Sequence, residues 1–94
     1  MKDFADKVAL ITGAGSGIGR ALSLELAEKG CNLALVDWNE DSLEETKQLL
    51  RKKNVAVSTH TFDISDKEKV TALPDEVIEF HKQIDLVFNN AGLS

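Results

Sequence analysis

The sequence predicts an α/β fold in which parallel strands alternate with helices. Three observations favour it. Short apolar runs recur at about residues 7–12, 32–37, 55–62 and 84–89 of the 94 residues. The segments between them carry apolar residues at helical spacing. Glycines and helix-capping residues stand where the spacing changes. The order β-α-β-α-β-α-β gives parallel strands joined by right-handed crossovers.

The first two strands frame a helix that begins at a glycine. Residues 7–12 ("KVALIT") form a short β-branched run, which predicts a strand buried on both faces. Residues 17–29 predict a helix that ends at Gly30, as a C-terminal glycine indicates. Ile18, Leu22 and Leu26, with the neighbouring Ala21, fall at helical spacing. Residues 32–37 ("NLALVD") predict a second buried strand.

A second helix and a more polar strand follow. Asn39 or Asp41 can cap a helix that runs to about residue 53. Its expected inner face consists of Leu43, Leu49 and Leu50. Residues 55–62 alternate between apolar and polar side chains, which is typical of a strand nearer the edge of a sheet.

The third helical segment contains a proline. Ser65 or Asp66 opens it, and it runs to about residue 83. Pro74 removes a backbone hydrogen bond and presses on the preceding turn, so we expect a break or kink near residues 72–74. The last strand runs from Ile84 to Asn89.

Composition bounds the class of protein. A length of 94 residues and 43% hydrophobic content predict one small globular domain. The net charge of -5 argues against nucleic acid or an anionic membrane surface as a partner. No apolar run is long enough to span a bilayer, and the charged N-terminus does not resemble a signal peptide. The single cysteine, Cys31, suits a reducing compartment, so we expect a cytoplasmic protein.

The glycine-rich stretch "TGAGSGIG" joins the first strand to the first helix. A helix N-terminus carries unpaired N–H groups and partial positive charge, and glycine lets the backbone approach an anion closely. Neither G-x-G-x-x-G nor the P-loop motif fits. The spacing that fits is Thr12-Gly13-x-x-x-Gly17-x-Gly19, in which Gly19 would let the helix lie close to a strand. The stretch therefore predicts a phosphate-binding turn.

An acidic residue follows the second strand. Asp37 lies at the position from which a carboxylate accepts hydrogen bonds from an adenosine ribose in dinucleotide-binding folds. It would repel a 2′-phosphate, and Ser16 and Trp38 stand where basic residues would be needed, so NAD is favoured over NADP. Alternatively, Asp37 only caps the turn into the next helix. Trp38 either flanks the adenine or serves in ordinary packing.

Three motifs together resemble the short-chain dehydrogenase/reductase family: "TGAGSGIG", "DI" at residues 63–64 and "NNAG" at residues 89–92. The resemblance covers essentially the whole chain. It implies a partial Rossmann-like three-layer parallel sheet with strand order 3-2-1-4. It also implies an NAD cofactor, with the adenine contacted by Asp63 and Ile64. The implied cofactor-binding residues are Gly13, Ser16, Gly17, Ile18, Gly19, Asp37, Asp63, Ile64, Asn90, Ala91 and Gly92. Asn89 has a rival role, since its amide could tie the fourth strand to its neighbour.

The resemblance does not extend to the catalytic residues of the family. In the family a tyrosine acts as acid/base, with a lysine four residues later and a serine that holds the substrate oxygen. This sequence contains no tyrosine. We therefore assign no catalytic residue, and His60, His81 and Lys82 are weak substitutes. No His/Cys cluster at metal-ligand spacing is present.

The resemblance also implies that residues 1–94 are the N-terminal half of an NAD(P)-binding domain that ends before the catalytic half. The longer protein would act on an alcohol/carbonyl pair, while this chain alone would be inactive. The last strand, Ile84 to Asn89, would leave an apolar edge that favours self-association. Two alternatives remain: a nucleotide-binding or interaction module without catalysis, and an assembly that forms only because the chain is cut. The substrate stays open.

Overall fold

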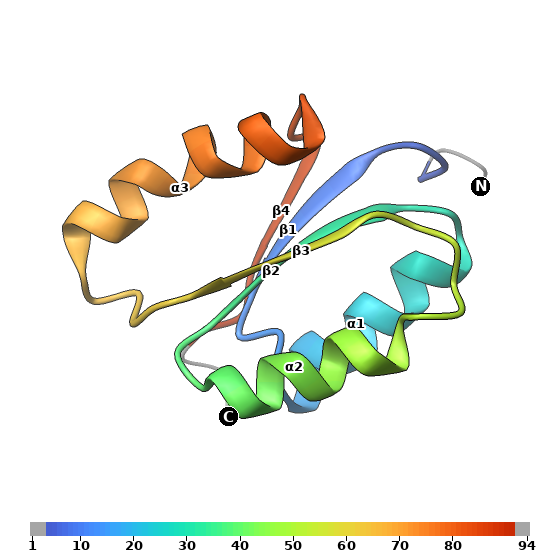
Figure 1. Ribbon diagram of the computed structural model, residues 1–94, viewed down its shortest axis with the longest axis horizontal. Helices are drawn as coiled ribbons and strands as arrows, with labels where there is room; N and C mark the ends of the chain where they lie inside the picture. Colours follow the sequence, from blue (N-terminus) through green and yellow to red (C-terminus); the bar gives the residue numbers. More distant parts are fainter. Residues whose placement is uncertain (1–3, 92–94) are drawn as a thin grey trace.

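A computed structural model describes residues 4–91 as a four-stranded parallel sheet with three helices (Figure 1). The strands are β1 (Val8–Thr12), β2 (Asn32–Asp37), β3 (Val57–Thr61) and β4 (Leu86–Asn89). The helices are α1 (Gly17–Glu28), α2 (Glu40–Leu49) and α3 (Lys67–His81). The sheet order is β3-β2-β1-β4, which confirms the predicted Rossmann-like topology.

The sheet is the middle of three layers. Figure 1 shows α1 and α2 on one face and α3 on the other. Alternate residues of each central strand therefore enter two separate cores, because side chains of a strand point to opposite faces. On β1, Ala9 and Ile11 face α1 and α2, whereas Val8 and Leu10 face α3. The uninterrupted apolar runs of β1 and β2 are thus explained by burial on both sides.

Two predicted helix faces need correction. Leu43 and Leu50 are buried as expected, but Leu49 is exposed, and Thr46 takes the inward position instead. In α1, Leu26 is buried whereas Ile18 is exposed, because Ile18 lies in the first turn, beyond the edge of the core. Helical spacing alone does not show where the neighbouring layer ends.

The helix caps agree with the polar residues of the sequence. Asn39 caps α2, where its side chain accepts from the N–H of Ser42 at 3.0 Å. Asp66 caps α3 in the same way. Of the break or kink predicted near residues 72–74, the break is wrong, since α3 continues through Pro74. Pro74 is exposed, so water can hydrate the carbonyl that loses its hydrogen bond in this turn.

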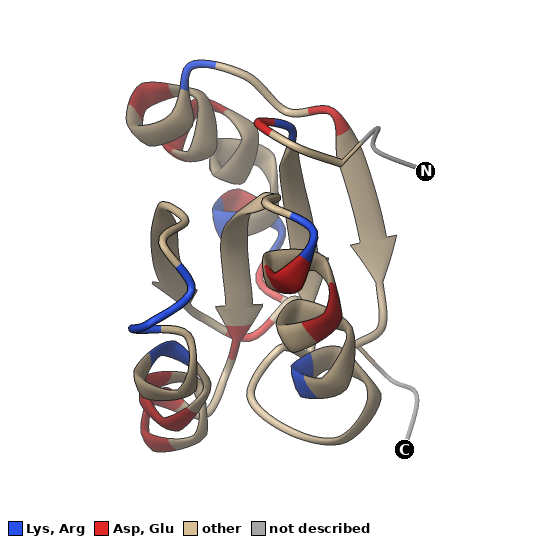
Figure 2. Cartoon of the chain, turned by 90° about the vertical axis from the view of Figure 1, so that its right-hand side faces the viewer, with Lys and Arg blue, Asp and Glu red and all other residues tan. Residues whose placement is uncertain are grey.

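Strand register brings four loops to one end of the sheet. Thr12 of β1 pairs with Val36 of β2 and with Asn89 of β4, and Asp37 pairs with Thr61 of β3. All the strands therefore end together, and the segments after them meet at the same edge. Figure 2 shows the charged residues mainly on helices and connecting segments, with the strands nearly free of them.

Candidate nucleotide-binding site

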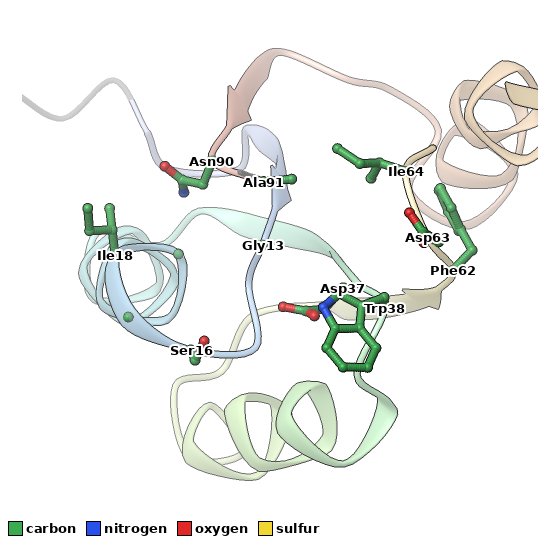
Figure 3. A pocket seen from close by; sticks show the side chains of 12 residues that line it. Gly13, Ser16, Ile18, Asp37, Trp38, Phe62, Asp63, Ile64, Asn90 and Ala91 are labelled. Carbon is green, nitrogen blue, oxygen red and sulfur yellow. The ribbon is translucent and has the colours of Figure 1, made fainter. Parts of the chain in front are cut away.

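A pocket of about 1000 Å³ lies at the carboxyl ends of the strands (Figure 3). The predicted site residues that the structure describes all line it. They are Gly13, Ser16, Gly17, Ile18, Gly19, Asp37, Asp63, Ile64, Asn90 and Ala91. Gly92 lies outside the described residues. This position, beyond the strand ends of an open α/β sheet, is where such sheets bind ligands.

The N-terminus of α1 forms one wall of the pocket. Ser16 is the N-cap residue, but its side chain makes no capping hydrogen bond within residues 4–91. The first turn of α1 contains no acidic residue. The partial positive charge and the free N–H groups of a helix start are therefore left for a ligand, and an anion is the group that they attract.

Two glycines shape this wall for different reasons. A Cβ atom on Gly19 would stand 1.9 Å from the carbonyl oxygen of Gly13, so only glycine lets the helix start beneath the turn. Gly17 has a φ of +56°, and a Cβ there would meet nothing within 4 Å. Gly17 thus borders open space at the pocket, where a diphosphate could approach the backbone.

Asp37 places a carboxylate at the centre of the site, between the glycine turn and Trp38 (Figure 3). Its Oδ2 accepts from the N–H of Gly15 at 2.8 Å, and its Oδ1 accepts from the N–H of Asn39 at 3.1 Å. Asp37 therefore does cap the turn into α2, which is the alternative role that the sequence allowed for it. Each carboxylate oxygen keeps acceptor capacity, so the same group can also receive ligand hydroxyls.

Aromatic residues flank the opposite side of the pocket. The Trp38 side chain is 71% exposed, which excludes an ordinary core-packing role for it. Phe62, which follows β3, is half-buried and also lines the pocket. Phe62 belongs to none of the motifs in the sequence, although its place directly before Asp63 is a signal that identifies it.

Asp63 presents a second carboxylate beside Ile64. The N–H of Ser65 donates to Asp63 Oδ1 at 2.9 Å. Hydrogen bonding from Ser65 lowers the pKa of the Asp63 carboxyl below its ordinary value, so the group is ionised at neutral pH. An ionised carboxylate can accept a hydrogen bond from an amine such as that of adenine.

The floor of the pocket is fastened to β1. Thr12 Oγ1 donates to Asn89 Oδ1 at 2.8 Å and accepts from the N–H of Ala91 at 3.1 Å. Asn89 thus ties the fourth strand to its neighbour, which confirms the rival role considered for it. Asn90 Nδ2 is buried and finds no partner among residues 4–91. A donor in this position suits an acceptor on a ligand.

Arg20 holds the glycine turn against α2. Its Nε donates to Thr46 Oγ1 at 2.9 Å, and its Nη2 donates to the carbonyl of Gly15. Nη2 also donates to the carbonyl of Ser42 at 3.0 Å and to Glu45 Oε1 at 3.1 Å. No spacing rule links position 20 to α2, so only the fold reveals this contact.

The weak catalytic candidates lie elsewhere. His60 and His81 both contact Ser58 Oγ, through their Nε2 atoms at 2.8 and 2.9 Å. Lys82 ends α3 in a left-handed conformation with a φ of 75°. None of the three lines the pocket.

Within residues 4–91, no three His, Cys, Asp or Glu side chains are grouped to hold a metal ion. In the same part of the chain, no helix has both the length and the apolar character needed to cross a bilayer.

Sequence comparison finds relatives of known class. A family profile described as short chain dehydrogenase matches residues 7–94. The Mycobacterium tuberculosis protein SadH is 44% identical over 94 residues, which are 100% of this chain and 34% of that protein. Epidermal retinol dehydrogenase 2 of Mus musculus is 41% identical over 93 residues, which are 98% of this chain and 30% of that protein.

Structure comparison agrees. The crystal structure of an NAD+-bound xylitol dehydrogenase matches with a TM-score of 0.92 and 41% identity, covering 96% of this chain and 35% of that one. A short chain dehydrogenase/reductase from Burkholderia phymatum in complex with NAD matches with a TM-score of 0.86 and 39% identity, covering 93% of this chain and 31% of that one. The chain thus spans about a third of the length of these relatives.

Proposed function

The chain belongs to the short-chain dehydrogenase family, and from this premise we propose that its pocket binds the adenosine diphosphate half of NAD. The observation that carries the proposal is the uncapped N-terminus of α1, which meets a glycine turn and two carboxylates at one sheet edge. The crystal structure of a xylitol dehydrogenase that matches 96% of this chain has NAD+ bound.

The glycine turn would hold the diphosphate. Residues 16–19 line the pocket, and the N–H groups in the first turn of a helix have no helical partners, so they can donate to phosphate oxygens. Gly17 leaves room for this approach, and Ser16 contributes a hydroxyl without adding charge. Ile18 and Gly19 complete this wall, while Asn90, Ala91 and Gly92 would lie beside the ribose.

Asp37 would accept hydrogen bonds from the two hydroxyls of the adenosine ribose. A 2′-phosphate in the same place would meet a carboxylate instead of a basic group, and this favours NAD over NADP. Asp63 would accept from the exocyclic amine of adenine, with Ile64 against the ring. Trp38, exposed at the rim, offers an aromatic face to the same base.

The longer protein to which such a chain corresponds would oxidise an alcohol or reduce a carbonyl. The nicotinamide of the bound cofactor accepts or donates the hydride in that reaction. The residues described here would contribute binding and orientation but no acid/base group, because the sequence contains no tyrosine. We expect the chain alone to bind the cofactor without turnover, in a reducing compartment such as the cytosol, where its buried Cys31 remains a thiol.

A second candidate is an interaction module without chemistry. β4 pairs with β1 on one side only, and among residues 4–91 no strand covers its other edge. Val87 of this strand is 62% exposed. An uncovered apolar edge is a template for pairing with another chain, so self-association through β4 is the second proposal.

Binding measurements with the Asp37→Ala variant test the first proposal. Calorimetric titration of the chain should show binding of NAD and weaker binding of NADP. The variant should lose affinity for NAD by about tenfold, since a hydrogen-bonded carboxylate is removed, and its preference over NADP should shrink. An unchanged ratio of the two affinities would show that Asp37 does not contact the ribose. Absence of NAD binding by the natural chain would refute the proposal.

A further inference from the structure

Gly15 stands in the glycine turn, yet the phosphate-binding spacing does not require a glycine there. It is buried and does not line the pocket. Both polar groups of its backbone are engaged. The N–H donates to Asp37 Oδ2 at 2.8 Å, and the carbonyl accepts from Arg20 Nη2. Gly15 thus bonds the Asp37 carboxylate, which is assigned to the ribose, and has no assigned contact with the diphosphate.

Packing explains why this residue has no side chain. A Cβ atom on Gly15 would stand 2.7 Å from Asp37 Oδ2 and 2.9 Å from the Cβ of Ser42. Gly15 is not among the residues with a left-handed backbone, so alanine would meet no conformational barrier there. The added methyl group would act only by displacing the Asp37 carboxylate or the start of α2.

Arg20 keeps the Gly15 peptide at this distance. Its guanidinium spans the gap from the turn to α2, where it bonds the Ser42 carbonyl and Thr46 Oγ1. Thr46 Oγ1 in turn donates to the carbonyl of Ala14 at 2.8 Å. Two successive carbonyls of the turn are therefore attached to α2. The rigid planar fork of arginine suits several acceptors at once, whereas the single ammonium of lysine does not.

We propose that Gly15 and Arg20 are positioning residues that hold the Asp37 carboxylate toward the ribose and thereby set the preference for NAD over NADP. The inference rests on the proposed function, because it assigns a role toward the same ligand. Neither residue touches the cofactor in this account. Gly15 orients the carboxylate by its N–H and by its lack of a side chain, and Arg20 fixes the peptide that carries this N–H.

Discrimination between NAD and NADP depends on the direction of the Asp37 carboxylate oxygens. Two ribose hydroxyls can both donate to one carboxylate only if its oxygens have a fixed direction. A carboxylate that rotates or withdraws loses hydrogen bonds to NAD and also repels a 2′-phosphate less. Displacement of Asp37 therefore lowers the affinity for NAD more than the affinity for NADP, whereas a general loosening of the turn would weaken both alike.

The test compares the ratio of the NAD and NADP dissociation constants in the full chain. Trp38 is the only tryptophan and borders the pocket, so its fluorescence reports binding directly. Gly15→Ala should lower the preference for NAD by about tenfold, the scale of lost hydrogen bonds to a charged group. Arg20→Lys should lower it in the same direction. Circular dichroism and thermal unfolding establish that each variant is folded.

Matched controls separate positioning from general damage. Arg51→Ala removes an exposed arginine that bonds only Gln48 within residues 4–91, and Glu45→Gln removes the exposed ion-pair partner of Arg20. Both should keep the natural ratio. In an Asp37→Ala background, Gly15→Ala should change the ratio no further, because its target is already gone.

Two failures are distinguishable. A natural chain that binds NAD in preference to NADP, with an unchanged ratio in folded Gly15→Ala or Arg20→Lys, would overturn this inference and leave the proposed function standing. A further fall of the ratio in the double variant would also overturn it, since Gly15 would then act without Asp37. A natural chain that binds neither nucleotide would refute the proposed function itself.

Discussion

Thr12 is the residue through which the pocket floor depends on the sheet. Its hydroxyl, in a side chain with little exposure, joins Asn89 Oδ1 to the N–H of Ala91. Thr12→Val keeps the shape but removes both hydrogen bonds. We predict a loss of about 1–3 kcal/mol in the free energy of unfolding, measured by urea denaturation. Binding of NAD should weaken as well, because Ala91 is released from its position.

Thr12→Ser is the matched control for this prediction. It retains the hydroxyl and removes one methyl group, so most of the stability and the binding should return. Full stability in the valine variant together with a loss in the serine variant would show that the methyl group, and not the hydrogen bonds, matters at this position.

Residue identities that belong to a local motif could be predicted from the sequence. The sequence predicts that the glycines of the phosphate-binding spacing lie near Asp37, because strand ends of a parallel sheet meet at one edge. The pocket does contain these glycines and Asp37. Arg20 and Gly15 could not be assigned their roles in this way. Arg20, which bonds the Gly15 carbonyl, also bonds Ser42 and Thr46 of α2, and no local pattern places that helix against the turn.

Helix α3 docks on the edge strand β3 through a polar contact. The two histidine Nε2 atoms converge on Ser58 Oγ, and His60 Nδ1 lies 3.1 Å from Glu76 Oε1. Burial, together with the neighbouring His60, lowers the pKa of His81 below its ordinary value. His81 is therefore held neutral in the folded chain at a pH where the unfolded chain would already bind a proton.

This difference predicts loss of stability in mild acid. A lowered pKa in the folded state means that the unfolded state takes up the proton first as the pH falls. The contribution of His81 is then complete above about pH 6.5, the ordinary value for histidine, and declines below it. Thermal unfolding from neutral to mildly acidic pH should show this decline, and His81→Gln should flatten it. A slope that is the same in the variant would assign the effect to another group.

Elements were predicted more reliably than their limits. The period of the apolar residues identified each strand and helix in order, since burial on one or two faces leaves its mark in the sequence. Pro74 misled the prediction because its cost depends on surroundings that the sequence does not contain. It lies on the exposed side of α3, where solvent replaces the lost hydrogen bond. Leu49 misled it because the next residue, Leu50, takes the inward position, and consecutive residues of a helix point in different directions.

At the scale of the whole molecule, the two edges of the sheet differ. β3 is a polar edge whose Ser58 contacts His81 of α3. β4 presents the exposed Val87 at an edge that no strand covers among residues 4–91. We predict self-association that increases with protein concentration in sedimentation experiments. Val87→Lys should reduce it, because a charged residue on an edge strand disfavours pairing.

Val70→Lys provides the control, since Val70 is an exposed apolar residue of α3 far from this edge in sequence. It should leave association unchanged. A chain that stays monomeric at all concentrations, or one whose association responds to Val70 and not to Val87, would contradict pairing through β4.

The central claim is that the start of α1 and its glycine turn cradle the diphosphate of an adenine dinucleotide. The most direct measurement follows the backbone amide NMR signals of the chain during titration with NAD. We predict that the signals of residues 16–19 and of Ala91 shift together and saturate. The signals of Ser58 in β3 and Glu76 in α3, which do not line the pocket, should stay in place. Shifts confined to other surfaces, or amide signals of residues 16–19 that do not move at saturating NAD, would contradict the claim.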